Sequence, residues 1–580
     1  MLREKLRDLV SAAAGTDAFN LIVPEQDAFG HYSTAVAMKL AKERGVAPLA
    51  LAGELAKKVK EAAPAGLFEK VEAVPPGFVN FWVTKKALQE EFADIAGDER
   101  YGLGSSLKGK TVMVEYTDPN PFKLFHIGHL MSNAIGESFA RLYEAVGAKV
   151  IRANYQGDVG LHVAMSVWAM QHVLPDLPKD NAPLVEKVEY LGKAYAVGSE
   201  AYHGLDKLAA GVAEDSNPKK AEIEAVNEKV YRRSDPEVNR LYNIGRKWSM
   251  EYFEDIYRRL GTKFDVYFPE SEVGAAGMEV IAAHPGVFVK SDGAIVFRGE
   301  EHGLHTRVFV SSKGLPTYEA KELGLNNKKF ELYPLDLSII VTGNEIAEYF
   351  KVLMKAMELV LPDVARKTRH VPHGMLRLPT GKMSSRTGKV VTAEALILEA
   401  KEQVKEKESG EGLSPSERKV NREAIAIGAI KYSILRQSPG QDIIFDFDTS
   451  LSIEGDSGPY LQYAYARLRS ILRKAGIEGG VASHKSQVAS LETDSELALI
   501  RKLLEFPVVV EYCAATLAAS GLAAYLHALA ALGNRFYEAE PILKDENEGR
   551  RAARLALVRT TAAVLARGLD LLGIAAPEKI

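Results

Sequence analysis

The spacing of apolar residues divides the chain into three stretches that differ in their expected elements. The first mixes helical periodicity, clearest around residues 51–62, with strand-like runs such as PPGFVNFWVT, which predicts a small α+β module. In the second, an apolar strand at residues 111–116 precedes a helical pattern towards Gly147 and a further strand, KVIRANYQGD. The third is helical almost throughout. We therefore predict three domains, at residues 1–105, 106–392 and 393–580.

The order of elements in the second stretch indicates a parallel sheet. A short crossover between two apolar strands returns the chain in the same direction, so we expect a Rossmann-like, doubly wound sheet with ligands beyond the carboxyl ends of its strands. No G-x-G-x-x-G follows the first strand, which argues against a dinucleotide cofactor. Charged residues at helical spacing from about 172 to 262 predict an inserted helical subdomain with solvated faces. The expected fold class is multidomain α/β with a C-terminal all-α bundle.

Composition sets limits on this picture. A chain of 580 residues with 47% hydrophobic and 26% charged residues is globular and too long for one core. Because the net charge is −4, any contact with nucleic acid must come from local basic patches. The single cysteine, Cys513, excludes an internal disulfide and a cysteine-based zinc site, and no metal site is expected in the protein.

Two features bear on location. The N-terminal residues MLREKLRDLVSAAAG intersperse charges with apolar residues and so lack the uncharged core of a signal peptide. The longest uncharged stretch, residues 512–533, is interrupted by Ser520, Gly521 and His527, so it is interpreted as two packed helices and not as a membrane span. We expect a cytoplasmic protein without membrane contact.

Two segments carry candidate phosphate chemistry. Residues 123–131, KLFHIGHLM, place His126 and His129 one turn apart at a helix start, where unpaired N–H groups and the helix dipole favour an anion. Residues 380–391, TGKMSSRTGKVV, form a glycine-flanked loop of cations and hydroxyls suited to phosphate oxygens. Alone, the first could be a metal pair or two unrelated histidines, and the second a solvated turn. Together, in this order, they predict nucleotide chemistry.

These two segments resemble the two signatures of class I aminoacyl-tRNA synthetases. Other stretches resemble arginyl-tRNA synthetases in particular: VEYTDPNPFKLFHIGH, NYQGDVGLH, PTYEAKELGL, IEGDSGPYLQYAYARLRSILRKAG and, near the N-terminus, GHYSTAVAMKLAK. The resemblance implies that L-arginine is ligated to tRNA(Arg) in two steps. ATP and arginine form arginyl-adenylate and pyrophosphate, and the arginyl group then moves to the 3′-terminal ribose of tRNA. It also implies Mg²⁺ with ATP, an N-terminal domain on the tRNA elbow, a C-terminal bundle on the anticodon, and activation that depends on tRNA. We expect a monomer.

The resemblance assigns residues to ATP. His126, Gly128 and His129 are expected to bind it, together with Met383, Ser384 and Ser385 of the loop. The expected catalytic residues are Lys123, His126, His129, Lys382 and Arg386. Where the usual class I loop has its second lysine, this chain has Ser385. Lys123 stands where many members have glycine, and members that lack the loop lysine tend to carry one there. We interpret Lys123 as the replacement cation, the alternative being an ordinary solvent-exposed lysine.

The amino-acid pocket is assigned in the same way. A guanidinium is bound best by a fixed carboxylate that accepts two parallel hydrogen bonds. The Tyr and Asp of the family match Tyr318 and Glu322, and the longer acid leaves open whether another, such as Glu345, assists. Asn120 and Asn154 match positions that hold the α-amino and carboxylate end of arginine. Asp118 stands where the family often has serine.

The helix expected to begin at Pro459 bears two stripes. One is apolar and is expected to pack on the bundle: Leu461, Tyr465, Leu468 and Leu472. The other combines ring faces with cations, as unstacked anticodon bases require: Tyr460, Tyr463, Arg467 and Lys474. These tyrosines could also be ordinary surface residues. The other functions considered are a non-enzymatic tRNA-binding relative, a small adenylyltransferase and a synthetase for another amino acid. Residues 126–129, His-Ile-Gly-His, are intact and oppose the first; they are called the HIGH sequence below. The long helical C-terminus opposes the second.

Overall fold

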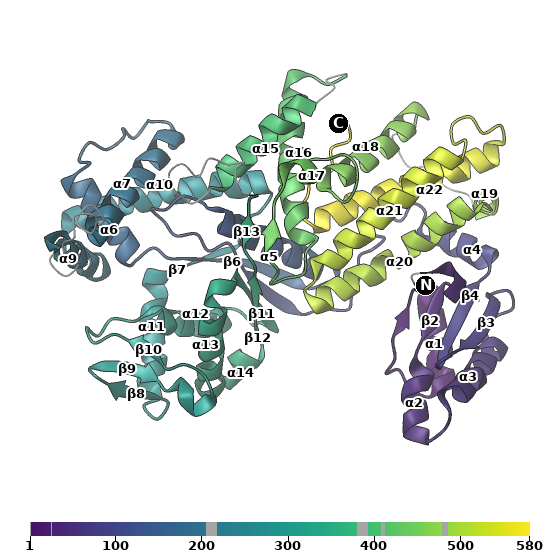
Figure 1. The fold of residues 1–580 in the computed structure, drawn as a ribbon, viewed down its shortest axis with the longest axis horizontal. Coiled ribbons are helices and arrows are strands. Elements are labelled where there is room, and N and C mark those ends of the chain that lie inside the picture. Colours follow the sequence, from purple (N-terminus) through teal and green to yellow (C-terminus); the bar gives the residue numbers. More distant parts are fainter. Residues whose placement is uncertain (1, 25, 205–216, 380–391, 408–411, 478–484) are drawn as a thin grey trace.

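The computed structural model of this protein describes residues 2–24, 26–204, 217–379, 392–407, 412–477 and 485–580 (Figure 1). A sheet-containing part lies in the middle of the molecule and is called the catalytic part after the expectation above; a helical bundle lies on one side of it and a small N-terminal module below the bundle. This arrangement confirms the predicted multidomain α/β class, whereas the exact domain boundaries stay predictions.

The N-terminal module is an antiparallel sheet covered by helices. Its strand order is β1 (Leu21–Ile22), β2 (Tyr32–Thr34), β4 (Phe78–Val83) and β3 (Phe68–Val74). The helices are α1 (Leu2–Ala14), α2 (Val36–Arg44) and α3 (Pro48–Ala62). Helix α1 has an apolar residue at every fourth position, and these four residues are buried: Leu2, Leu6, Val10 and Ala14. The expected α+β character is therefore confirmed.

The catalytic part is built on five parallel strands in the order β12-β11-β5-β6-β7. Their bounds are β5 (Thr111–Glu115), β6 (Lys149–Gln156), β7 (Val266–Pro269), β11 (Leu337–Gly343) and β12 (Thr368–His373). Helix α5 (Ile127–Ala145) connects β5 to β6 and packs on one face, and α11 (Glu270–Ala283) and α12 (Tyr318–Leu332) pack on the other. The chain proceeds from β5 to β6 and β7 on one side, and places β11 and β12 on the other. The switch point is therefore at β5, where doubly wound sheets bind ligands.

Two additions interrupt this sheet. Between β6 and β7 lie α6 (Leu161–His172), α7 (Leu184–His203), α9 (Pro218–Arg232) and α10 (Pro236–Leu260). These helices share a hydrophobic core of their own, which includes Trp168, Leu191 and Leu241 and also Phe122 from the loop before α5. The expectation of solvated faces was thus incomplete, since each helix also buries one face.

The second addition is a small antiparallel sheet of β8 (Phe288–Ser291), β9 (Ala294–Phe297) and β10 (Arg307–Val310). After β11, α13 (Ala347–Val360) and α14 (Pro362–Arg366) lead to β12.

The C-terminal part is helical, as expected. Its main helices are α15 (Ala393–Lys407), α16 (Pro415–Leu435), α18 (Gly458–Lys474), α20 (Asp494–Thr516), α21 (Ala519–Ala539) and α22 (Glu548–Leu571), with short α17 (Phe447–Ser450) and α19 (Lys485–Val488). The uncharged stretch at 512–533 is divided between α20 and α21, which confirms the two-helix interpretation. No helix in the described ranges is long and apolar enough to cross a membrane.

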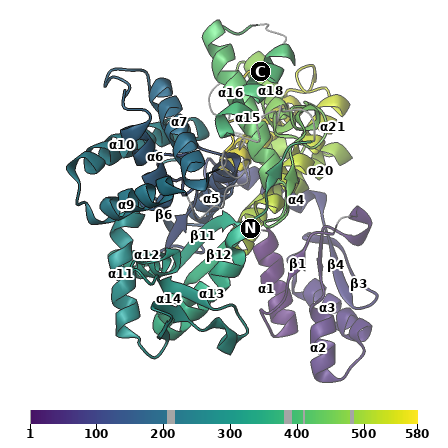
Figure 2. The ribbon, with the colours of Figure 1, turned by 60° about the vertical axis from the view of Figure 1, so that its left-hand side comes forward.

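Backbone pairing joins the bundle to the catalytic part. Strand β13 (Leu376–Arg377) follows β12 and pairs in parallel with β14 (Ile443–Ile444), which lies after α16. The N-terminal module reaches the bundle through α4 (Lys85–Ile95), and Figure 2 shows α4 beside α20. Gln89 Nε2 donates to Leu491 O (2.8 Å), and the Tyr101 hydroxyl donates to Leu503 O (2.8 Å).

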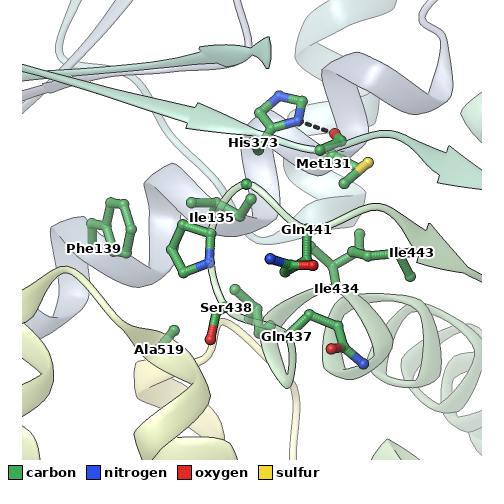
Figure 3. A pocket seen from close by; sticks show the side chains of 14 residues that line it. Met131, Ile135, Phe139, His373, Ile434, Gln437, Ser438, Gln441, Ile443 and Ala519 are labelled. Atoms are coloured by element: carbon green, nitrogen blue, oxygen red, sulfur yellow. Dashed lines mark hydrogen bonds between the residues drawn. The ribbon is translucent and has the colours of Figure 1, made fainter.

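The junction between α5, the end of β12 and the bundle is tightly packed. Figure 3 shows Met131 and Ile135 of α5 facing His373 and the loop that follows α16. The space between them is about 10 Å³, which is room for one water molecule at most. Nearby, Lys431 of α16 is buried, and its ammonium group donates to Leu260 O (2.6 Å) at the end of α10 and Gly573 O (2.7 Å) after α22. Burial lowers the pKa of Lys431 to about 8. This seam holds the parts together and is not a ligand site.

Candidate active site

The two histidines of the HIGH sequence cap helix α5. His126 is the residue before the helix, and its Nδ1 accepts hydrogen bonds from the backbone N–H groups of Gly128 (3.1 Å) and His129 (3.3 Å). In return, His129 Nδ1 accepts from the backbone N–H of His126 (3.3 Å), and the two rings stack with centroids 3.5 Å apart. The expectation that first-turn N–H groups are left for a phosphate is therefore wrong for those of Gly128 and His129, because the His126 imidazole already accepts from both.

This cap determines the protonation state of both imidazoles. A ring nitrogen that accepts from an N–H group carries no proton, so each neutral ring holds its proton on Nε2. Burial lowers the pKa of His126, and the charge of Lys123 lowers it further. Burial and the neighbouring His126 hold the pKa of His129 well below its usual value. At neutral pH the site therefore offers two uncharged Nε2–H donors. A Cβ at Gly128 would lie 3.0 Å from the His126 ring, so glycine keeps the cap compact.

Lys123 lies beside these histidines. Its side chain is half-buried, and its ammonium nitrogen is 5.0 Å from the centre of the Tyr195 ring in α7. The charge of Lys123 lowers the pKa of His126, His129 and His162, so it acts on the same space as the HIGH residues. The Lys123 ammonium group therefore lies close to the two histidines, and its role towards ATP stays a prediction.

The described chain that follows the second signature lies next to the first. Lys382, Met383, Ser384, Ser385, Arg386 and Lys389 are outside the described residues. The residue that follows them, Thr392, forms an antiparallel bridge with His126, and the Ala393 N–H donates to Phe125 O (3.0 Å). The described chain therefore resumes directly against the HIGH sequence.

Glu322 is an unpaired buried acid on α12. Its side chain is 2% exposed, and its Oε2 has no hydrogen-bond partner among the described residues. Burial raises the pKa of Glu322 to about 8, the charge of Glu115 contributes to this rise, and the Tyr318 hydroxyl opposes it. Tyr318 lies one turn earlier on α12, with 42% of the residue exposed. A cationic ligand group is what this carboxylate lacks.

The acidic residues near Glu322 differ in whether they form an ion pair. Glu115 pairs with Lys329 (2.6 Å), and Glu270 pairs with Lys321. Asp118 has only a backbone partner, the N–H of Tyr155, which donates to Oδ1 (2.8 Å). Burial raises the pKa of Asp118 well above its usual value, and the charge of Glu115 adds to the shift. Neither Asp118 nor Glu322 forms an ion pair among the described residues, although the charge of Lys329 lowers the pKa of both.

Backbone strain accompanies Asp118. Thr117 and Asp118 have φ of 80° and 45°, values that residues with a Cβ rarely adopt and β-branched residues least of all. The turn directs the Asp118 carboxylate onto β6, where Tyr155 caps it. Strain of this kind persists where the surroundings determine it, and here it coincides with the pocket.

Three other residues were expected at or near the bound arginine: Asn120, Asn154 and Glu345. Asn120 Oδ1 lies against Gly157, where a Cβ would come within 2.2 Å of it, so Asn120 is at the pocket edge. Asn154 is fully buried; its amide nitrogen donates to Tyr116 O (3.1 Å), and its amide oxygen accepts from Gln156 (3.2 Å). This placement fits a support of the strand end, and a direct contact with arginine stays a prediction. Glu345 is exposed, and its charge acts on His126 and His373.

Sequence reasoning missed His162. Its Nε2 is 2.8 Å from Gly157 O, and burial lowers the pKa of His162 to about 3, with the charge of Lys123 adding to the effect. It is therefore a neutral ring on which the charges of both Lys123 and Lys321 act. The only sequence signal was its place in NYQGDVGLH, directly after the second strand.

The two stripes of α18 are arranged largely as expected. Leu461, Tyr465, Leu468 and Leu472 are buried, which confirms the packing stripe. In the other stripe, Arg467 donates to Asn534 (3.1 Å) and lies over the Tyr463 and Tyr537 rings (4.9 and 5.9 Å). Tyr460 accepts from the same Asn534 (3.1 Å), and Lys474 is exposed. Beside them is a cavity of about 370 Å³ lined by Tyr463, Arg467, Lys474 and Tyr537. The second stripe is thus a prearranged aromatic and cationic surface.

Three family models match the chain end to end. Residues 1–83 match the arginyl tRNA synthetase N terminal domain, residues 95–447 match the class I (R) tRNA synthetase catalytic domain, and residues 461–580 match the DALR anticodon binding domain. Among curated relatives, the arginine–tRNA ligase of Bacteroides fragilis (strain YCH46) is 30% identical, over 95% of this chain and 94% of the relative. That of Treponema denticola is 32% identical, over 92% and 90%.

Solved structures agree with these matches. The arginyl-tRNA synthetase of Thermus thermophilus superposes with a TM-score of 0.82 and 27% identity over 100% of both chains. The Plasmodium falciparum enzyme gives 0.78 and 21% over 100% and 98%, which supports the fold alone. Since one family model covers more than half of this chain and a relative of 30% identity spans nearly all of it, the chain belongs to the arginyl-tRNA synthetases of class I.

Proposed function

We propose how the residues of this arginyl-tRNA synthetase share the work of joining arginine to tRNA with ATP. In the first step, a carboxylate oxygen of arginine attacks the α-phosphorus of ATP, and pyrophosphate leaves in line. The attacking carboxylate is already ionised, so no general base is needed. Positioning and neutralisation of developing charge therefore supply most of the catalysis.

The phosphate side of the site is assigned to Lys123, His126 and His129. The two Nε2–H groups suit phosphate oxygens because they donate without a charge that would need a partner in the empty enzyme. Lys123 adds the positive charge for the transition state. Gly128 keeps this surface open to the adenosine, and Lys382, Met383, Ser384, Ser385 and Arg386 are retained here as sequence predictions.

Mg²⁺ is assigned to ATP itself. The described residues hold no cluster of three histidine, cysteine, aspartate or glutamate side chains able to bind a metal, and both Nδ1 atoms of the HIGH pair accept from backbone N–H groups. Phosphate oxygens and water are the ligands that Mg²⁺ prefers beside a nucleotide. The ion would neutralise phosphate charge while Lys123 and the histidines hold the remaining oxygens.

The amino-acid side is assigned to Glu322, Tyr318, Asp118 and Asn120. Glu322 and Tyr318 would hold the guanidinium, since a buried carboxylate with a free oxygen gains most from a cation with parallel donors. Asp118 and Asn120 are nearer to the HIGH sequence and are assigned to the α-amino end of arginine. The carboxylate of arginine then faces ATP.

The second step transfers the arginyl group to the terminal ribose of tRNA. We assign the N-terminal module to the tRNA elbow, and Tyr460, Tyr463, Arg467 and Lys474 to the anticodon. A monomer stays a prediction. The N-terminal module rests on α20 of the bundle, so both proposed tRNA contacts belong to one connected frame.

The observation that carries the assignment is the buried Glu322, whose Oε2 has no hydrogen-bond partner among the described residues. The test is ATP–pyrophosphate exchange with each of the twenty amino acids, with and without tRNA. We expect exchange with arginine alone, and only when tRNA is present. Glu322→Gln should abolish it, whereas Glu319→Gln, the same change one turn away at an acid that faces Arg307 (3.8 Å), should leave it near the wild-type rate. Exchange with another amino acid, or an active Glu322→Gln enzyme, would contradict the assignment.

A further inference from the structure

The segment that precedes the HIGH sequence is held by the helical insertion. Phe122 has φ of 69°, and its backbone N–H donates to Ser249 Oγ of α10 (2.8 Å). Its ring lies against Gly245, where a Cβ would come within 2.0 Å of it. The Phe125 N–H donates to the Tyr252 hydroxyl (3.4 Å). Helix α10 therefore fixes the backbone on both sides of Lys123.

Helix α7 contacts the side chains between these two anchors. Leu124 lies against Gly192, where a Cβ would be 3.5 Å from the Leu124 side chain. Three residues later, on the same face of α7, the Tyr195 ring lies under the Lys123 ammonium group at 5.0 Å. Consecutive side chains of the loop thus meet consecutive turns of one helix.

The Tyr195 ring is the contact that can orient the Lys123 charge. No acid among the described residues forms an ion pair with Lys123, whereas many surface lysines of this chain have one. A lysine stem has four rotatable bonds, so an unheld ammonium group spreads over many positions. The negative face of a tyrosine ring restricts it without neutralising its charge, which a carboxylate would do.

We propose that Tyr195 is a positioning residue that directs the Lys123 ammonium group towards the phosphates of ATP. The inference rests on the role proposed above for Lys123 and adds that the inserted helices set its geometry. A neutral partner is required at this point because the same charge must remain available to the transition state. The insertion is in this respect part of the active-site wall.

The test compares substitutions in one helix. Tyr195→Leu removes the ring face, Tyr195→Phe keeps it, and Tyr202→Leu removes a similar contact, with Lys220 at 5.7 Å, elsewhere in α7. We measure single-turnover adenylate formation with tRNA present, together with KM for ATP. Tyr195→Leu should lower the rate about fivefold or more with little change in KM, Tyr195→Phe should stay within about twofold, and Tyr202→Leu should match the wild type.

A second background separates positioning from packing. In an enzyme with Lys123→Met, the further change Tyr195→Leu should have no effect, because the ring then has no charge to orient. An equal loss from Tyr195→Leu in both backgrounds would overturn the inference and make the ring a packing element. If Lys123→Met is slow but Tyr195→Leu is fully active, the inference about Tyr195 is overturned and the proposed role of Lys123 stands. A fully active Lys123→Met enzyme would overturn the proposed role of Lys123 as well.

Discussion

The ammonium nitrogen of Lys329 lies 2.6 Å from a carboxylate oxygen of Glu115, and both side chains are almost completely buried. Lys329 thus neutralises the charge of Glu115, as Lys321 neutralises that of Glu270. Two carboxylates, Asp118 and Glu322, are left for a ligand, and free arginine carries two cationic groups. Each of these two carboxyl groups can therefore gain a cationic partner when arginine binds.

Arginine binding should release a proton near neutral pH. The pKa of Glu322 in the empty enzyme is about 8, so the group is mostly protonated at pH 7, and a bound guanidinium favours its anion. Affinity should therefore rise from pH 6 to 9, and proton release should fade above pH 9. Calorimetry in two buffers of different ionisation heat measures this release, and Glu322→Gln is the control. Equal binding heats in both buffers at pH 7 would refute the idea.

Asp118→Asn should weaken arginine binding about tenfold or more. The amide oxygen keeps the acceptor for the Tyr155 N–H, so the change removes the charge with little effect on the strained turn. KM for arginine in the exchange assay measures the effect, with Glu345→Gln as the matched control. An unchanged KM would restrict Asp118 to capping β6.

Lys123→Met should lower kcat about a hundredfold or more and affect ATP binding less, because the charge acts mainly in the transition state. Ser385→Lys, which restores the usual loop lysine, should recover part of this loss. The measurement is a double-mutant cycle on single-turnover adenylate formation with tRNA. If Ser385→Lys changes both backgrounds by the same factor, the two positions act independently.

Tyr463→Ala should raise KM for tRNA about tenfold, since one stacked base contributes about 1–3 kcal/mol. Arg467→Lys should also weaken tRNA binding, because it keeps the charge but loses the contact with Asn534. The control is Tyr465→Phe on the buried stripe, and KM for arginine should be the same in all three. An unchanged KM for tRNA would make the stripe an ordinary surface.

Arg554→Met should destabilise the bundle by about 3–5 kcal/mol. Arg554 is buried among three acids, Glu496 (2.7 Å), Glu540 (2.6 Å) and Asp545 (3.0 Å), and its loss leaves them without their shared cation. Denaturant unfolding measures the change, and Arg551→Met, at a surface pair, is the control. A midpoint equal to that of the control would show that the acids protonate at little cost.

Local patterns were sufficient for the elements and for part of the site. The apolar strand and the HIGH sequence predicted a helix start at the carboxyl edge of a parallel sheet, and α5 begins there. The four-residue spacing in α18 predicted its buried stripe, because periodicity reports which face is covered.

Contacts between distant segments were not predictable in this way. Periodicity does not say what covers a face, so the packing of α7 and α10 against residues 122–125 was missed. The pair of Glu115 and Lys329 has no local signal, and the use of N–H groups by His126 depends on its rotamer. Glu322 could be matched by position, but its missing partner is visible only when every neighbour is placed.

The buried Lys431 gives the molecule a built-in reporter. Near pH 8 about half of this amine is neutral and hence nucleophilic, yet in the folded enzyme the ends of α10 and α22 cover it from any reagent. Acylation of Lys431 can occur only while these helix ends are apart. Its labelling rate, followed by mass spectrometry against exposed lysines of the same chain, therefore measures how often the catalytic part and the bundle separate at their junction.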